Sequence, residues 1–183
     1  MLRAVGVMGL VFFLAPVGMA QERELLRKNL VGKAPPELVA FEADWLAGPP
    51  TNFASLKGKV VWLQFNFWEN CTSFRRHLVR WEADYADRGL VVVDVSGGEH
   101  ATFADSARLL AKANITHPVI WDRNNALHKA YGVQAWPVAF LIGADGNVFW
   151  QGNPALMRGQ KDEEKAFREL LETHLRRATA KAD

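Results

Sequence analysis

The sequence predicts an α/β protein, a three-layer sandwich in which a mixed central sheet carries helices on both faces. Segments rich in β-branched and aromatic residues alternate with segments that have one apolar face at helical spacing, which favours parallel strands joined by helices. The last two strand-like segments are instead separated by a short Asp-Gly turn, which makes that pair antiparallel. The chain has 183 residues, 49% hydrophobic and 23% charged, and this suits one globular domain.

Residues 1–20 are predicted to be a secretory signal rather than part of the fold. Arg3 supplies a short positive start, residues 4–14 are apolar, and Gly18 and Ala20 are the small residues expected before a cleavage site. The apolar run is short for a bilayer span. We therefore expect an exported protein, periplasmic or otherwise outside the cytoplasm, which contacts a membrane only if this segment stays uncleaved as an anchor.

The rest of the chain is expected to form a lead-in, one domain and a tail. Residues 21–30 are the lead-in, either a short amphipathic helix or a frayed segment. The domain covers residues 31–178, and residues 179–183 form the tail. Four prolines between residues 31 and 56 favour extended segments and turns over helix at the start of the domain.

The first strand and helix of the domain follow a Lys57-Gly58-Lys59 turn. Residues 60–67, VVWLQFNF, are apolar on both faces except at two amide residues, which is typical of a buried central strand. Residues 72–88 have one apolar face at helical spacing, and this predicts a helix with Gly89 just after its end. That face consists of Phe74, Leu78, Trp81 and Tyr85.

The alternation then continues to the end of the domain. Residues 90–95, LVVVDV, predict a second buried strand, followed by a Gly97-Gly98 turn. An amphipathic helix comes next, with an apolar face of Phe103, Ala107, Leu110 and Ala111. The remaining expected elements are a strand over residues 118–122, a short helix capped by Asn124 or Asn125 and closed by Gly132, a hairpin of residues 137–143 and 147–152 around Asp145-Gly146, and a helix over residues 161–178.

Several short stretches, taken in their order and spacing, resemble the thioredoxin-like superfamily. They are Val31-Gly32-Lys33-Ala34-Pro35, the turn and strand from Lys57 to Val61, Phe67-Trp68 followed by Cys71, Gly89-Leu90-Val91-Val92, and Ala135-Trp136-Pro137 before FLIGADGNV. Within that superfamily the chain is most similar to the exported TlpA-type thiol–disulfide oxidoreductases, also grouped with redoxins. The resemblance covers residues 31–175, and it implies a thioredoxin-like fold and thiol-dependent chemistry.

The motif that carries this chemistry in the family is altered here. The family has Phe-Trp-x-x-x-Cys-x-x-Cys, whereas this chain has a single cysteine, Cys71. Three alignments stay open: Cys71 as the attacking thiol with Phe74 at the resolving position, Asn70 and Ser73 at the two thiol positions, or Cys71 as the second thiol. The thiol pair is broken in all three. Because one thiolate must attack and a second must resolve the mixed disulfide, the presence of a single cysteine excludes an intramolecular dithiol cycle.

Cys71 is the candidate nucleophile of a monothiol reaction that an external thiol completes. At the start of the helix over residues 72–88, exposed amides and the helix dipole favour a thiolate, and Arg75, Arg76 and His77 add positive charge nearby. Such a thiol forms a mixed disulfide or reacts with peroxide to a sulfenic acid. The alternative is a small, inert, buried cysteine in a redox-inactive binding or scaffold module.

The resemblance also implies a substrate-binding surface at Trp136 and Pro137. In the family a cis-proline at this place lies against the active-site cysteine, and the residue before it offers backbone groups to a peptide. The alternative for Pro137 is an ordinary trans proline at the start of an edge strand. Trp68 is a further candidate for the peptide groove, against a role in core packing. Glu69 is either a proton acceptor near the thiol or, as is commoner for glutamate, a solvated carboxylate.

Other function classes fit less well. A one-cysteine peroxidase has Thr and Pro where this chain has Trp68 and Gln64. Cys71, His77, His117 and Met157 lack a recognisable copper-binding spacing, so we expect no metal and no other cofactor. The net charge is +2, with acidic and basic residues mixed along the chain, which argues against a nucleic-acid partner. The expected partner is a protein or a low-molecular-weight thiol or disulfide.

Overall fold

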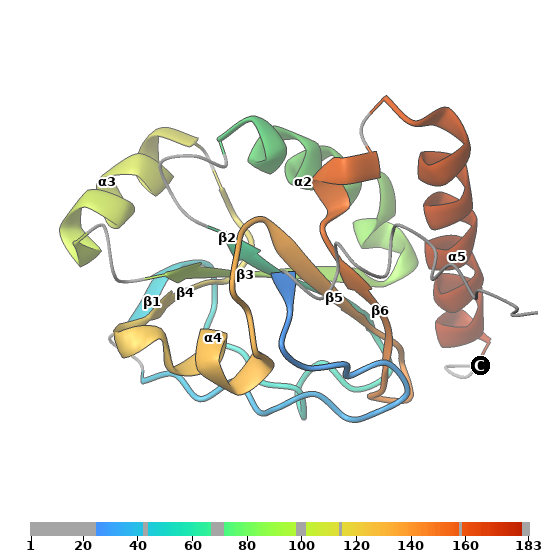
Figure 1. The fold of residues 1–183 in the computed structure, drawn as a ribbon, viewed down its shortest axis with the longest axis horizontal. Coiled ribbons are helices and arrows are strands. Elements are labelled where there is room, and N and C mark those ends of the chain that lie inside the picture. The colour runs from blue at the N-terminus through green and yellow to red at the C-terminus, as the bar shows by residue number, and fades with distance from the viewer. Residues whose placement is uncertain are drawn as a thin grey trace, which may run out of the picture.

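The computed structural model describes residues 25–41, 44–66, 72–97, 102–113, 115–157 and 159–180. Its centre is a six-stranded sheet in the order β1-β4-β3-β2-β5-β6, with helices on both faces (Figure 1). This confirms the predicted fold class. The expected signal segment, residues 1–20, lies outside the described residues. None of the helices in the described parts of the chain is long and apolar enough to cross a membrane.

Three strands form the middle of the sheet. Strand β2 (Val60–Asn66) pairs in parallel with β3 (Leu90–Gly97) and antiparallel with β5 (Val138–Ile142). Every residue of β2 is buried. Helices cover both of its faces, so the strand carries apolar side chains on both, as the sequence predicts.

The outer strands lie on either side of this centre. Strand β4 (Val119–Asp122) runs parallel to β3, and β6 (Val148–Gly152) forms the predicted hairpin with β5. A further strand, β1 (Trp45–Ala47), pairs antiparallel with β4 at the edge. The sequence does not predict β1, because it is only three residues long and lies among prolines and glycine, where local signals favour turns.

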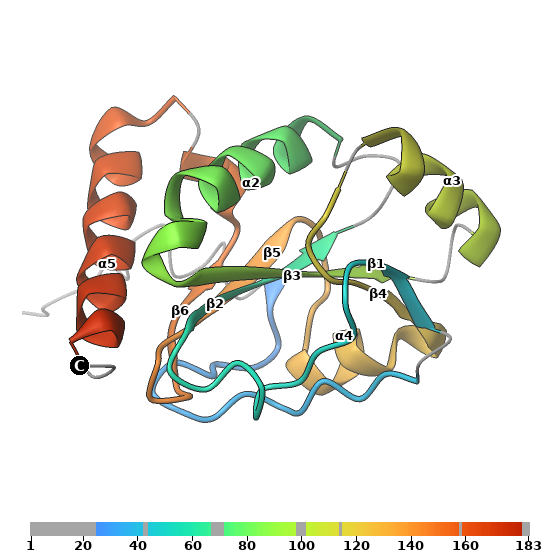
Figure 2. The ribbon, with the colours of Figure 1, turned by 180° about the vertical axis from the view of Figure 1, so that it is seen from behind.

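In the described part of the chain, four α-helices cover the sheet. Helices α2 (Thr72–Tyr85) and α5 (Lys161–Thr179) pack on one face, α4 (Ala126–Tyr131) covers the opposite face, and α3 (Phe103–Ala113) lies on the α2 side near β1 and β4, as Figures 1 and 2 show from opposite sides. Each face has its own apolar core. Side chains buried beneath α2 and α5 include Trp62, Leu78, Leu141 and Leu171, and those on the α4 side include Phe65, Tyr131 and Phe140.

Two local predictions need correction. Strand β3 continues through Gly97, so Gly97 is not part of a turn; Gly98 lies outside the described residues. In α3, Phe103 is 40% exposed and Ala111 is exposed, whereas Leu110 and Ser106 are buried. The helix is therefore rotated relative to the face that the apolar residues alone suggest, and the ring of Phe103 contacts the edge of Trp121 instead.

The lead-in packs against the domain where it is described. Leu26 is buried and forms an isolated antiparallel bridge with Val133. The backbone amide of Arg27 donates to the carbonyl of Gly132, and the backbone amide of Gln134 donates to the carbonyl of Leu25. Residues 25–30 therefore share the core on the α4 side although no local pattern in the sequence assigns them to it.

Gly48 offers a test of how tightly the edge of the sheet is packed. Its φ is +66°, and a Cβ there would lie 2.6 Å from the His117 carbonyl carbon and the Pro118 nitrogen. Gly58 also has a positive φ, +83°, but no atom lies within 4 Å of its Cβ position among the described residues. We expect Gly48→Ala to cost about 1–3 kcal/mol more unfolding free energy than Gly58→Ala. Urea unfolding of both variants measures this, and equal losses would contradict it.

Candidate functional site

The structure places only part of the predicted site. Trp136 and Pro137 lie in the connection between α4 and β5, and the peptide bond between them is cis, the isomer that the resemblance implies. Trp136 is half-buried and packs against the core on the α4 side. Cys71 and Trp68, the other two predicted site residues, lie outside the described residues.

Trp136 ends a chain of hydrogen bonds that starts at β4. Its indole Nε1 donates to Nε2 of His128 at 2.8 Å. The other ring nitrogen of His128, Nδ1, lies 2.6 Å from Oδ2 of Asp122. His128 is 3% and Asp122 is 2% exposed, so this chain is shielded from water.

Asp122 also holds the start of α4. Its Oδ1 accepts from the amide of Leu127 at 2.9 Å, and its Oδ2 accepts from the amide of His128 at 2.8 Å. Asn125 stands at the N-cap position, one of the two predicted, but the capping contacts come from Asp122. Asn124 and Asn125 adopt left-handed backbone conformations, with φ of 59° and 52°, and the side chain of Asn125 makes no capping hydrogen bond. The left-handed turn lets the chain reverse, so that the carboxylate at the strand end reaches the helix amides.

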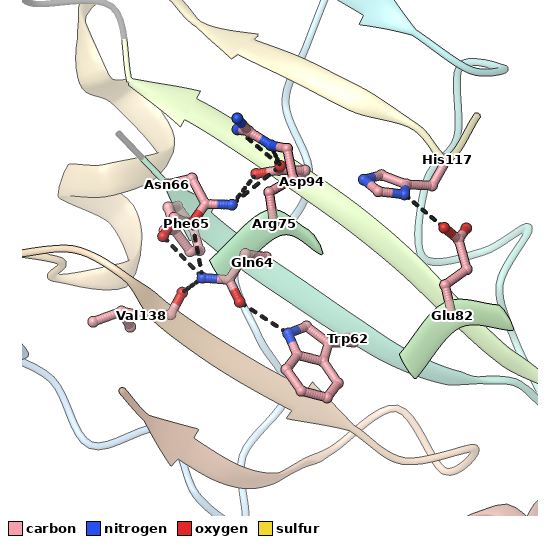
Figure 3. A network of polar contacts seen from close by, with 9 residues as sticks. All are labelled: Trp62, Gln64, Phe65, Asn66, Arg75, Glu82, Asp94, His117 and Val138. Atoms are coloured by element: carbon pink, nitrogen blue, oxygen red, sulfur yellow. Dashed lines mark hydrogen bonds and ion pairs between the residues drawn. The ribbon is translucent and has the colours of Figure 1, made fainter. Parts of the chain in front are cut away.

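A second buried network runs beneath the start of α2 (Figure 3). Nε1 of Trp62 donates to Oε1 of Gln64 at 3.0 Å. The side-chain nitrogen Nε2 of Gln64 donates to the carbonyl of Val138 at 3.0 Å. Val138 is the first residue of β5 and follows Pro137. These bonds satisfy an amide that is wholly buried in the middle of the sheet.

The same network contains a buried ion pair. Nδ2 of Asn66 donates to both oxygens of Asp94, at 3.0 and 3.1 Å, and Nε and Nη2 of Arg75 lie 3.4 Å from Asp94 Oδ2 (Figure 3). Arg75 is 4% exposed. Of the three basic residues that the sequence places near the thiol, Arg75 therefore has its charge matched by Asp94. Arg76 is exposed, and His77 is half-buried.

His77 lines a cavity of about 280 Å³ between α2, a turn at residues 154–157 and the start of α5. Met157 lines it too, together with aromatic rings and Glu164. His117 is located elsewhere and bonds Glu82 through Nδ1 at 2.8 Å. The residues weighed for copper are thus not all in one place, and the described part of the chain has no group of three or more His, Cys, Asp and Glu side chains arranged to hold a metal.

Tyr131, the last residue of α4, anchors the end of the helix opposite its capping carboxylate. Burial raises the pKa of Tyr131 far above its usual value, and the charge of Glu37 raises that pKa further. The hydroxyl therefore stays protonated and donates to the carbonyl of Pro36. His128 and Tyr131 both contact Phe65 on β2, so α4 is tied to the central strand at two points.

Sequence reasoning did not identify Asp122 and His128. The available signals were an aspartate at the end of a predicted strand and a histidine six residues later, at the start of a predicted helix. Neither signal indicates a contact with Trp136, because the two ring nitrogens of a histidine acquire partners only when the turns around it are placed.

Comparison with known proteins agrees with this fold. The sequence profile of the AhpC/TSA family matches residues 31–151. The chain belongs to the AhpC/TSA family. As a member of that family it is a redoxin of the thioredoxin-like superfamily, and thiol–disulfide oxidoreductases are among its relatives.

Three relatives of this AhpC/TSA-family protein illustrate the likeness. It is 35% identical to protein DipZ of Mycobacterium tuberculosis over 112 residues, 57% of this chain and 16% of DipZ, so it spans only a small part of that protein's length. It is 26% identical to the thiol-disulfide oxidoreductase ResA of Bacillus cereus over 156 residues, 83% of this chain and 80% of ResA. A secreted disulfide oxidoreductase of Mycobacterium tuberculosis superposes with a TM-score of 0.52 and 22% identity, over 60% of this chain and 79% of that one, which supports the fold.

Proposed function

We propose that this protein is an exported monothiol exchange protein that forms mixed disulfides through Cys71. The observation that carries the proposal is a family match to thiol–disulfide chemistry in a chain with one cysteine. In this proposal residues 1–20 are the signal, 21–30 the lead-in, 31–178 the domain and 179–183 the tail. Export is supported by the signal-like segment and by the secreted relative.

The reaction is an exchange in which thiols and disulfides balance. The Cys71 thiolate attacks one sulfur of a substrate disulfide, forms a mixed disulfide and releases the other sulfur as a thiolate. An external thiol then attacks the mixed disulfide, regenerates Cys71 and leaves with the substrate sulfur. The external thiol is required because a second protein thiol is missing from the sequence.

Trp68, Trp136 and Pro137 form the proposed surface for a peptide substrate. The half-buried position of Trp136, with Pro137 just before β5, supports this assignment for the last two residues. An extended peptide beside them would present its disulfide to the thiol. The substrate class is therefore a protein or peptide disulfide, with a low-molecular-weight thiol as the resolving partner.

Intact-mass spectrometry tests the proposal. The folded chain is incubated with a peptide disulfide, and we expect an adduct with the mass of one peptide half, which glutathione removes. Cys71→Ser gives no adduct and serves as the control, with its folding checked by circular dichroism. Alkylation of the folded chain at several pH values should also detect the Cys71 thiolate at pH values well below the pKa of an ordinary cysteine.

Two results would contradict the proposed function. An adduct that forms only after unfolding in denaturant would mean that the Cys71 thiol is inaccessible in the folded protein, as expected for a redox-inactive binding module. Catalytic disulfide reduction without any added monothiol would contradict the conclusion that a single cysteine needs an external thiol to complete the reaction.

A further inference from the structure

The hydrogen bonds of His128 determine where its proton lies. An indole nitrogen is a donor and has no acceptor capacity, so Nε2 of His128 must receive the Trp136 hydrogen through its lone pair. The ring proton of the neutral imidazole therefore lies on Nδ1 and is donated to Asp122 Oδ2. Each partner requires the same tautomer, in the way that a carboxylate orients a metal-binding histidine.

The ring of His128 has little freedom to move. Phe65 packs edge-on against it, with ring centroids 5.0 Å apart. On another side the backbone of Gly97 approaches so closely that a Cβ there would lie 3.3 Å from Cε1 and 3.4 Å from Nε2. The aspartate, the phenylalanine and the glycine belong to β4, β2 and β3, so three neighbouring strands of the sheet hold the acceptor in place.

We propose that His128 is a positioning residue for peptide binding, which orients the indole of Trp136 beside Pro137. Asp122 supports this role by holding the neutral tautomer. The inference deepens the proposed function, since it assumes that peptides bind at Trp136. It predicts that peptide recognition depends on an acceptor at this ring position, whereas the reactivity of the thiol toward a small disulfide does not.

The first test observes the indole directly. In a protein with ¹⁵N-labelled tryptophan, Trp136→Phe identifies the Nε1–H signal of Trp136. We expect that signal to exchange slowly with water in the wild type, and to shift and exchange faster in His128→Phe, which keeps a planar ring but removes the acceptor. His128→Gln restores an acceptor near the position of Nε2 and should recover much of the protection. An unchanged signal in His128→Phe would overturn the proposal.

The matched control is His117→Phe. His117 is also buried, and its Nδ1 bonds a carboxylate, Glu82, but among the described residues its Nε2 has no hydrogen-bond partner and so bonds no tryptophan. A buried histidine is thus lost in both variants, and only His128→Phe should release the indole. If His117→Phe changes the Trp136 signal as much as His128→Phe does, the effect is a general loss of stability and the inference is wrong.

The second test measures binding without thiol chemistry. A peptide in which serine replaces cysteine is titrated into each variant, and its Kd is measured from chemical shifts. We expect about a fivefold weaker Kd in His128→Phe, as the loss of one hydrogen bond predicts, partial recovery in His128→Gln and no change in His117→Phe. Equal affinity in wild type and His128→Phe would overturn the inference.

Adduct formation with cystine, a small disulfide, separates the two proposals. The inference expects His128→Phe to lower the rate with the peptide disulfide more than the rate with cystine, and a parallel loss for cystine and peptide would contradict it. Absence of adducts in the wild type contradicts the proposed function alone, because the indole signal and the Kd of the serine peptide still test the role of His128.

Discussion

Replacing Asp94 with alanine should lower the free energy of unfolding by about 3–5 kcal/mol. The carboxylate is fully buried on β3 and is held by two bonds from Asn66 and by the guanidinium of Arg75. Its removal takes away the buried carboxylate that faces the Arg75 guanidinium beneath α2, and it removes the acceptor of the Asn66 amide. Urea unfolding followed by circular dichroism measures the loss, with the slope against urea concentration checked for constancy.

A surface pair provides the control for this prediction. Lys165 and Glu169 also form an ion pair, but both side chains are more than two-thirds exposed, so Glu169→Ala should change the unfolding free energy by less than about 0.5 kcal/mol. The double variant Arg75→Met with Asp94→Ala should cost less than the sum of the single changes, because the guanidinium that faced the carboxylate is gone as well. Additive losses would show that the two groups do not act as a pair.

Replacing Trp62 with alanine is the second large change, with an expected cost of about 3–5 kcal/mol. The side chain is 1% exposed, and its ring contacts those of Trp81 and Phe167 with centroids 5.5 Å apart. Its loss opens a cavity between β2 and the two helices on that face. It also removes the donor to Oε1 of Gln64, which leaves a buried acceptor without that hydrogen bond.

Two further variants separate these contributions. Trp62→Phe keeps much of the ring volume and removes the donor, so it should cost clearly less than alanine. Phe41→Ala removes an aromatic ring that is 73% exposed and should cost less than about 0.5 kcal/mol. Denaturant midpoints of the variants provide the comparison. A Trp62→Ala midpoint close to that of Phe41→Ala would mean that the core beneath α2 and α5 is not packed as the structure describes.

Much of the fold is predictable from local patterns. The run at residues 60–66, apolar except for two amide residues, indicates a strand covered on both faces, and the Asp145-Gly146 turn indicates a hairpin. Each of these signals depends on only a few neighbouring residues. Gly89 follows its helix with φ of +91°, as a helix-ending glycine does. Two features without such a signal are not predicted. Strand β1 is too short to show an alternating pattern of apolar residues, and the buried face of α3 includes a serine.

The candidate site divides in the same way. Family resemblance on the sequence selects Trp136, Pro137 and Cys71, but it does not say which groups hold them. Asp94 and Arg75 are 19 residues apart, and they meet because parallel pairing of β2 and β3 places Asp94 beneath α2. A carboxylate with no sequence neighbour of opposite charge thus acquires one from the packing of a helix on a sheet.

The sequence by itself determined the number of cysteine thiols, the alternation of strands and helices, and the family, since these depend on residue identity and short-range spacing. Only the tertiary structure decided the partners of the buried polar groups. Asp122 ends β4, His128 lies in α4, and Trp136 lies in the connection from α4 to β5. A shift of one residue in either connection would separate the nitrogen and oxygen atoms that now lie 2.6 to 2.8 Å apart. Hydrogen bonds are that sensitive to position, whereas burial of apolar surface is not directional.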